Sequence, residues 1–215
     1  MNTIYVMRHG ESVVNLEHRL TCPRPEGDLT DRGREQAARA AAWLRARRIS
    51  AIHTSPFHRA VQTAWIAGES IGLNVEMDDD LREMDCGDLE GRTDADAWEA
   101  WAMVYRRWKA HDLEAAFPGG ETYATAKARM QRALDRAVAR PGDVLLVTHG
   151  GITRTVLPYL CVNAAALQRA EDLGNTAFIV LEPYDPGRFV CLSWNLAEHL
   201  VDARDNGHQD EHPMR

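Results

Sequence analysis

The 215-residue chain lacks an excess of positive charge: its formal net charge is −7, and almost all of its positive charge is arginine. An acidic chain argues against nucleic acid or an anionic membrane as the main partner. The first residues, MNTIYVMRHG, lack the basic start and long apolar stretch of a signal peptide, and no apolar run approaches the length that spans a bilayer. We therefore expect a soluble, cytoplasmic protein with neither nucleic acid nor membrane as partner.

Paired cysteines and metal-binding motifs are also missing. The cysteines contain no CxxC pair and are scattered along the chain, at Cys22, Cys86, Cys161 and Cys191. This pattern favours reduced thiols over a disulfide framework. The nine histidines include no HExxH or similar spacing of metal ligands.

Short apolar, β-branched runs alternate with longer segments of helical spacing. The expected strands are Thr3–Met7, Ala51–Thr54, Val144–Thr148, Ala177–Leu181 and Phe189–Trp194. The expected helices are Thr30–Arg48, Phe57–Ile71, Ala95–His111, Thr122–Ala139 and Ile152–Leu160. With 45% hydrophobic residues the chain can form a hydrophobic core without disulfides or a structural metal. This alternation predicts an α/β fold, a mostly parallel sheet with helices on both faces.

Charged and titratable residues follow three of the expected strands. The first expected strand is followed by RHG (residues 8–10). The second ends at TSP (54–56), and Arg59 lies three residues further on. The strand VLLVT is followed by HGG (149–151). In open parallel sheets, ligands bind beyond the carboxyl ends of the strands. We therefore expect two histidines and two arginines to meet at one edge of the sheet.

Cations crowded at one place indicate an anion, and the arginine fork matches phosphate oxygens. Helix N-termini expected after His9 and His149 would add backbone N–H donors. A neutral imidazole is a nucleophile, and Arg8 beside His9 disfavours protonation of that ring. Taken singly, each residue has an ordinary explanation: His149 as a local cap, Arg59 as part of a solvated helix face. Their joint placement favours phosphate chemistry.

Five segments in order, RHGESVVN, SPFHRAVQTA, LREMDCGDLEG, PGGET and VTHGG, resemble the motifs of the histidine phosphatase superfamily, which contains the cofactor-dependent phosphoglycerate mutases and related phosphatases. The resemblance runs from Thr3 to about Leu160 and continues more weakly to about Glu198. It implies the phosphoglycerate mutase-like fold: a mostly parallel central sheet, helices on both faces and a small helical cap. We expect a single domain over residues 1–201, with the cap at about 92–120 and a disordered tail at 202–215.

The resemblance also implies roles for the residues at the strand ends. His9 is the expected nucleophile, which becomes a phosphohistidine. Arg8, Arg59 and His149 are expected to clamp the phosphoryl group and stabilise its charge during transfer. Glu83, in LREMD, matches the residue that protonates the leaving oxygen and then activates water.

Further positions match the family's phosphate contacts: Asn15 and Thr21 in the loop after the first histidine, and the backbone of Gly150. The resemblance implies no metal and no cofactor. One departure lies in LTCPRPEGDLTDRG, where Cys22 replaces the usual glycine and one residue is inserted at about 23–25. Arg24 in this loop either contacts a second anionic group of the substrate or lies in solvent.

The sequence favours a phosphatase over a mutase. Cys86 and Asp94 stand where the mutases have a tyrosine and a lysine, and the chain lacks the long insertion that mutases carry before PGGET. Arg106 and Arg107 resemble the mutases' carboxylate-binding pair, so the mutase stays open as the alternative. A third class, a non-catalytic binder of phosphorylated ligands, would be expected to lack His9 or Glu83.

The expected cap carries an aromatic stripe at helical spacing, made of Trp98, Trp101, Tyr105 and Trp108. The stripe either packs on the domain or turns one or two rings toward the phosphate pocket. In the second case the substrate is a small-molecule phosphate monoester bulkier than phosphoglycerate. The physiological substrate and the oligomeric state, a homodimer included, stay open.

Overall fold

The computed structural model describes residues 2–20, 27–167 and 173–200. Its centre is a six-stranded sheet of order β3-β2-β4-β1-β5-β6. The strands are β1 (Ile4–Arg8), β2 (Ile49–Thr54), β3 (Val75–Met77), β4 (Asp143–Thr148), β5 (Phe178–Asp185) and β6 (Arg188–Leu196). Strands β1 to β4 pair in parallel, whereas β5 is antiparallel to both β1 and β6. The mostly parallel sheet is thus confirmed.

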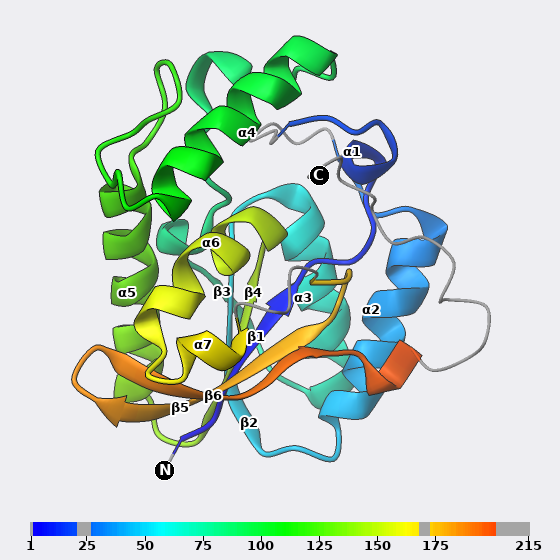
Figure 1. The fold of residues 1–215 in the computed structure, drawn as a ribbon. Helices are drawn as coiled ribbons and strands as arrows, with labels where there is room; N and C mark the ends of the chain where they lie inside the picture. The colour runs from blue at the N-terminus through cyan, green and yellow to red at the C-terminus, as the bar shows by residue number, and fades with distance from the viewer. Residues whose placement is uncertain (1, 21–26, 168–172, 201–215) are drawn as a thin grey trace.

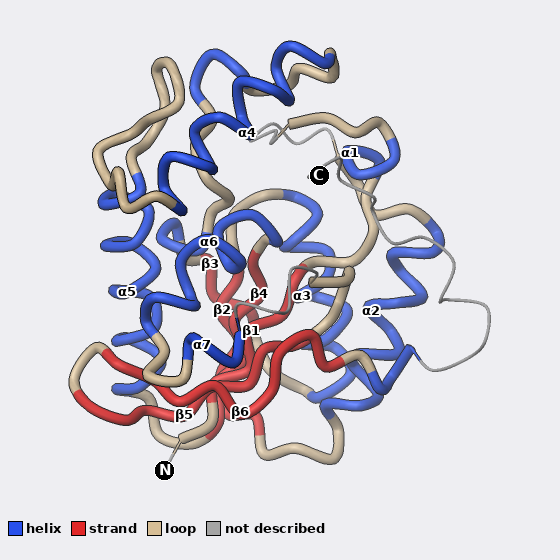
Figure 2. Tube along the Cα trace, viewed as in Figure 1, coloured by secondary structure: helices blue, strands red, loops and turns tan. Residues whose placement is uncertain are grey.

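Helices cover both faces of the sheet (Figures 1 and 2). The α-helices are α1 (Val13–Leu16), α2 (Asp31–Leu44), α3 (His58–Ile71), α4 (Ala95–Lys109), α5 (Tyr123–Ala139), α6 (Gly150–Leu160) and α7 (Ala164–Leu167). Three short 3-10 helices complete the described elements: η1 (Asp79–Leu81), η2 (Gly87–Leu89) and η3 (Glu198–Leu200).

Alternating side chains of the central strands pack into two separate hydrophobic cores, one on each face of the sheet. On β4, Val144 and Leu146 pack with α4, α5 and α6, while Leu145 and Val147 pack with α2 and α3. All four side chains are buried. A strand with both faces covered reads as a continuous apolar run, because successive side chains point to opposite faces. This burial on both faces explains why residues 144–147 (VLLV) are all apolar.

The start and end signals of the helices agree with the structure. The Thr30 side chain accepts the backbone N–H of Gly33 and begins α2, and Gly72, with φ of 74°, ends α3 in the left-handed conformation. A helix does begin after His9, but three residues separate His9 from the four-residue α1. After His149, α6 begins at once.

Strand β3 and helices α1 and α7 were not predicted, because segments of three or four residues carry too little periodicity. Thr21, Cys22, Arg24 and the expected tail lie outside the described residues. Within the described residues, no helix is long and apolar enough to cross a membrane. The cytoplasmic location stays a prediction.

Candidate active site

The parallel register brings the expected residues to one edge of the sheet. Arg8 lies opposite Thr148 in the β1–β4 pair, and the His9 backbone N–H donates to the Thr148 oxygen at 3.0 Å. Beyond β2, the Ser55 N–H donates to the Val147 oxygen at 2.9 Å. The ends of three parallel strands are therefore level, and the ring centroids of His9 and His149 are 5.1 Å apart.

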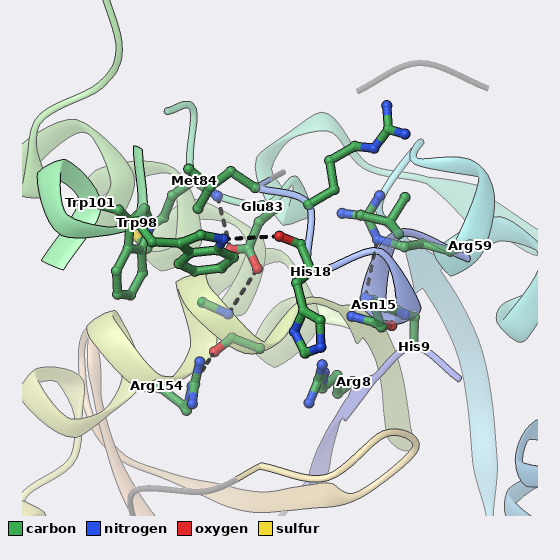
Figure 3. A pocket seen from close by; sticks show the side chains of 15 residues that line it. Arg8, His9, Asn15, His18, Arg59, Glu83, Met84, Trp98, Trp101 and Arg154 are labelled. Atoms are coloured by element: carbon green, nitrogen blue, oxygen red, sulfur yellow. Dashed lines mark hydrogen bonds between the residues drawn. The ribbon is translucent and has the colours of Figure 1, made fainter. Parts of the chain in front are cut away.

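An open pocket lies over these strand ends (Figure 3). Among the residues that line it are six of the predicted catalytic and substrate-binding residues: Arg8, His9, Asn15, Arg59, Glu83 and Gly150. His149 lies deeper, with none of its surface exposed. The structure thus brings together every predicted site residue except Thr21, which lies outside the described residues.

The His9 ring is held by a hydrogen bond at each nitrogen. Nδ1 lies 2.7 Å from the Gly10 carbonyl oxygen, and because a carbonyl only accepts, Nδ1 carries the proton. Nε2 then carries the lone pair, which accepts the Arg59 Nε–H at 3.1 Å. This tautomer leaves Nε2 as the basic nitrogen of the ring.

The surroundings keep the His9 ring neutral. Burial lowers its pKa well below the ordinary value, and the Arg59 and Arg8 guanidinium groups lower it further; the hydrogen bond to Gly10 acts in the opposite direction. The expected effect of Arg8 is therefore present, but burial is the largest cause. A neutral imidazole is the form that can attack phosphorus.

His149 has one bonded nitrogen and one without a partner. Its Nε2 lies 2.7 Å from Ser55 Oγ, and the backbone N–H of Phe57 donates to the same oxygen at 3.3 Å. The buried Nδ1 has no hydrogen-bond partner among the described residues. Burial, followed by Arg59 and His9, lowers the pKa of His149 well below its ordinary value. A buried unpaired ring nitrogen fits a ligand oxygen.

The Glu83 carboxylate lies at the N-terminus of α6. Its Oε1 accepts the N–H groups of Met84 at 2.9 Å and Ile152 at 2.5 Å, and its Oε2 accepts the Gly151 N–H at 2.8 Å. A Cβ on Gly151 would lie 2.8 Å from the Glu83 oxygens, so a larger residue at this position would displace the Glu83 carboxylate. An acidic side chain at a helix N-terminus is stabilised by the backbone donors and the helix dipole.

Asn15 is held in place by neighbours that were not predicted. Its Oδ1 accepts the backbone N–H and the hydroxyl of Ser12, at 3.1 and 3.0 Å. Asn175, before β5, donates from Nδ2 to the His9 carbonyl oxygen at 3.0 Å and to Asn15 Oδ1 at 3.5 Å. Asn175 lies 166 positions from His9, and no local pattern connects the two.

Two glycines permit the tight packing of the loop that follows His9. A Cβ on Gly10 would lie 2.5 Å from the Gly33 carbonyl oxygen, and a Cβ on Gly33 would lie 1.9 Å from the Glu11 oxygen. Both distances are shorter than side chains allow, so the loop and the start of α2 meet backbone to backbone. This contact fixes the chain directly after His9.

Helix α4, in the segment predicted to form a cap, turns two aromatic rings toward the pocket. Trp98 and Trp101 line it, and Trp98 Nε1–H donates to the His18 carbonyl oxygen at 2.9 Å (Figure 3). Both interpretations of the aromatic stripe therefore hold in part, because Trp108 is buried in the core. Arg154, which also lines the pocket, was missed. It follows Gly150 by four residues on α6, the spacing of neighbours on one helix face.

Arg106 and Arg107 do not line this pocket. Arg106 Nη1 bonds Glu99 at 3.0 Å, and Arg107 Nη2 bonds Asp112 at 2.7 Å. Both pairs are exposed.

Among the described residues, no group of three or more His, Cys, Asp or Glu side chains is arranged to hold a metal ion.

A neutral histidine between arginines, at the carboxyl edge of an α/β sheet, is an arrangement suited to binding a phosphate group. The model of the histidine phosphatase superfamily (branch 1) matches residues 4–197. The chain therefore belongs to this family.

Named relatives agree with this membership. Phosphoglycerate mutase-like protein 4 of Arabidopsis thaliana is 29% identical over 208 residues, 93% of this chain and 87% of the relative. Glucosyl-3-phosphoglycerate phosphatase of Mycolicibacterium vanbaalenii is 29% identical over 214 residues, 90% and 92% of the two chains. The solved structure of a mycobacterial glucosyl-3-phosphoglycerate phosphatase with VO3 superposes with a TM-score of 0.76 at 28% identity and covers 91% of this chain and 100% of that one. These similarities support a phosphatase of the histidine phosphatase type, a phosphoric monoester hydrolase.

Proposed function

We propose that the protein hydrolyses a small-molecule phosphate monoester through a phosphohistidine at His9, without a metal. The observation that carries this proposal is the hydrogen bonding of the His9 ring. Its Nδ1–H is fixed on the Gly10 oxygen, and its Nε2 lone pair faces the Arg59 guanidinium. An arriving phosphoryl group offers Arg59 a stronger, charge-assisted partner, which releases the lone pair for attack.

In the first step, His9 Nε2 attacks phosphorus in line with the departing alcohol. The N–P bond forms, the bond from phosphorus to the ester oxygen breaks, and the alcohol oxygen takes a proton from Glu83. Arg8, Arg59 and His149 stabilise the negative charge on the three phosphoryl oxygens.

The hydrogen bonds of the Glu83 carboxylate leave one lone pair that is able to carry the proton. A carboxylate offers about four lone-pair sites. Oε1 already accepts two backbone N–H groups, from Met84 and Ile152, and Oε2 accepts one, from Gly151. The remaining lone pair of Oε2 is thus the site that carries the proton and gives it to the alcohol.

In the second step, Glu83 takes a proton from water, and the resulting hydroxide attacks phosphorus. The N–P bond breaks, its electron pair returns to His9 Nε2, and inorganic phosphate leaves. Asn15 and the Gly150 backbone N–H assist phosphate binding in both steps. Asn175 acts as a positioning residue through the His9 carbonyl and Asn15.

The alternative, a cofactor-dependent phosphoglycerate mutase, needs a second anion-binding group that holds the phosphorylated intermediate. The candidates for that group were Arg106 and Arg107. Because these side chains bond Glu99 and Asp112 on the surface of α4 and its C-terminal turn, their arrangement favours the phosphatase.

The proposal is tested by phosphate release from a panel of phosphate monoesters in EDTA, with and without 3-phosphoglycerate and 2,3-bisphosphoglycerate. We expect release from several esters, loss of that release in His9→Ala and no isomerisation of phosphoglycerate. Activity above a few per cent in a folded His9→Ala protein would exclude His9 as the nucleophile. Rapid interconversion of 3- and 2-phosphoglycerate with little release would favour the mutase instead.

A further inference from the structure

One arginine lies in the apolar face of α5. Arg129 is 6% exposed. The residues of α5 that lie on the same face are buried and apolar: Ala126, Met130 and Ala133. A charged side chain is almost never fully buried unless it is paired. The partner of Arg129 is Glu121 of the PGGET segment, and the mechanism above gives a role to neither.

The Arg129 guanidinium uses all of its N–H groups. Nε donates to Glu121 Oε2 at 3.1 Å, and Nη2 donates to Glu121 Oε1 at 2.6 Å. Three backbone carbonyl oxygens accept the other hydrogen bonds. Nη1 donates to those of Asp80 at 3.0 Å and Arg82 at 2.5 Å, and Nη2 donates to that of Glu83 at 3.0 Å. A guanidinium has five N–H donors, so each of them has a partner here.

The three carbonyl oxygens belong to the loop that carries the proposed acid. Residues 82–86 lie outside the helices and strands, so their backbone groups need partners other than those of a helix or a sheet. The Leu81 carbonyl oxygen accepts the Thr148 hydroxyl at 2.7 Å. Four successive carbonyl groups, those of residues 80–83, therefore accept hydrogen bonds from Arg129 or Thr148.

Glu121 bonds the loop beyond the proposed acid. Its Oε1 also accepts the backbone N–H of Asp85 at 2.9 Å, and its own backbone N–H donates to the Asp85 carbonyl oxygen at 3.1 Å. A Cβ on Gly120 would lie 2.4 Å from that carbonyl oxygen, so a larger residue there would push the two backbones apart. The ion pair therefore bonds the backbone on both sides of Glu83.

The Glu83 side chain extends from this loop to α6, where its carboxylate accepts the N–H groups of Gly151 and Ile152. We propose that Arg129 and Glu121 are positioning residues that fix the backbone of Glu83. The remaining lone pair of Oε2 is thereby held toward the leaving oxygen. This inference rests on the proposed function, because it takes Glu83 as the group that protonates the alcohol.

Neither stability nor charge alone accounts for the ion pair. Replacing a buried ion pair by packed apolar side chains of similar size is often neutral or stabilising. A lysine would supply the same charge, but its three donors share one nitrogen and cannot reach a carboxylate and three carbonyl groups together. The planar fork of Arg129 is what connects Glu121 to the loop.

The test compares kcat for glycerol 3-phosphate, an alkyl ester whose leaving oxygen needs a proton, with kcat for 4-nitrophenyl phosphate, whose leaving group does not. Both rates come from one preparation, so their ratio does not depend on the folded fraction. A positioned acid contributes roughly 10²–10⁴-fold, and a displaced acid loses part of that. In Arg129→Lys we therefore expect kcat to fall about tenfold for the alkyl ester and less than about twofold for the aryl ester.

A second variant, Glu121→Gln, tests the same inference if Arg129→Lys does not fold. The amide keeps the size of the side chain and loses its charge and one accepting oxygen. The ratio of the two kcat values should change in the same direction, by about threefold, which is the effect of one weakened hydrogen bond. An equal loss on both esters in these variants, or a wild-type ratio in both, overturns the inference.

Arg132→Gln is the matched control. Arg132 follows Arg129 by three residues on α5 and bonds the Asp80 carboxylate at 2.6 Å, with 57% of its side chain exposed. Arg136 bonds the same carboxylate at 2.7 Å. Because exposed ion pairs contribute little, Arg132→Gln should keep the wild-type ratio.

The combination of Arg129→Lys with Glu83→Gln shows whether the arginine acts through the glutamate. Residues that act together are not additive. Without the acid, Arg129→Lys should leave the ratio of the two kcat values at that of Glu83→Gln alone. A further selective loss on the alkyl ester would overturn the inference, since the arginine would then act on proton transfer without Glu83.

Hydrogen exchange separates this inference from the proposed function. The N–H groups of Gly151 and Ile152 lie in the first turn of α6, where N–H groups have no partner within the helix, and both bond Glu83. In Arg129→Lys they should exchange about tenfold faster relative to the Leu146 N–H of β4, the effect of a lost hydrogen bond to a charged group. Such a change supports the placement of Glu83 by Arg129 even if turnover is absent and the proposed function fails. Unchanged exchange overturns it.

Discussion

Arg59 donates its Nε–H to the Nε2 atom of His9 at 3.1 Å, so a cation contacts the atom proposed to attack phosphorus. Both side chains are buried, with 4% and 3% of their surface exposed. The same contact is, after burial, the largest cause of the lowered pKa of the imidazole, and it orients the lone pair. The arginine therefore contacts the atom that we propose as the nucleophile.

Replacing Arg59 by glutamine should raise the pKa of His9. Burial remains the largest cause of the lowered pKa, and Arg59 is the next, so the value should rise without reaching that of an exposed histidine. The measurement is an NMR titration of the His9 ring protons. Arg34→Gln, which removes an exposed partner of Asp31, is the control and should leave the titration unchanged. An unaltered His9 titration in Arg59→Gln would show that the guanidinium does not set the charge of the ring.

The protein should lose stability as the pH falls below about 6.5. Burial lowers the pKa of His9 and of His149 in the folded state, whereas both titrate near 6.5 when unfolded. The unfolded state then binds more protons, so the free energy of unfolding rises with pH in this range. Between pH 7 and 5.5 the loss should be roughly 1 kcal/mol for each histidine. Urea unfolding at both pH values measures this loss of free energy, and the loss should be smaller in His149→Gln. An equal loss in His149→Gln would show that His149 does not contribute to the pH dependence of stability.

The framework of the site could be predicted because its residues follow strands whose burial shows in the sequence. Val144 to Val147 are apolar without interruption, so the strand and the position of His149 at its end were evident. His9 and Arg59 were found in the same way. Parallel pairing then places these ends at one edge, and the structure has them there.

Partners supplied by distant segments could not be predicted. Asn175 precedes an antiparallel strand, and it reaches His9 only because β5 pairs with β1. Ser55 was visible at a strand end, but its bond to His149 depends on the register of β2 against β4. Such contacts arise from the sheet order, which local spacing does not determine.

Ser55→Ala should slow turnover and lower stability together. The variant leaves His149 Nε2 without its partner at 2.7 Å in a site where both residues have none of their surface exposed. An unpaired buried polar group costs about 1–3 kcal/mol, and the orientation of a ring that contacts the phosphoryl group is lost. We expect kcat to fall about tenfold or more, by the size of a hydrogen bond to a charged group. Ser70→Ala, which removes an exposed bond to Arg45, is the control. A wild-type kcat in Ser55→Ala would exclude Ser55 as a positioning residue.

Glu83→Gln should affect poor leaving groups most. An alkyl phosphate such as glycerol 3-phosphate needs the proton that Glu83 supplies, whereas 4-nitrophenyl phosphate releases an anion that is stable without it. The amide has one accepting oxygen for three backbone N–H groups, so unfolding should also become easier by about 1 kcal/mol. Steady-state kinetics on both esters and urea unfolding separate the effects. Equal losses of rate on the two esters would indicate a structural role and no proton transfer.

Substitutions of Arg154 and Arg106 should differ in their effect on catalysis, although both residues are helical arginines, Arg154 on α6 and Arg106 on α4. Arg154 lines the catalytic pocket and donates to the Gly150 carbonyl oxygen at 3.2 Å, whereas Arg106 bonds Glu99 on the exposed side of α4. Arg154→Met should raise KM for phosphate esters about tenfold, because a cation near the bound dianion is lost while most of the aliphatic stem is kept. Arg106→Ala should change kcat and KM less than about twofold, since exposed ion pairs contribute little. The opposite result, a large effect at Arg106 and none at Arg154, would mean that the substrate extends along the outer face of α4 and would reopen the carboxylate-binding role on which the mutase alternative depends.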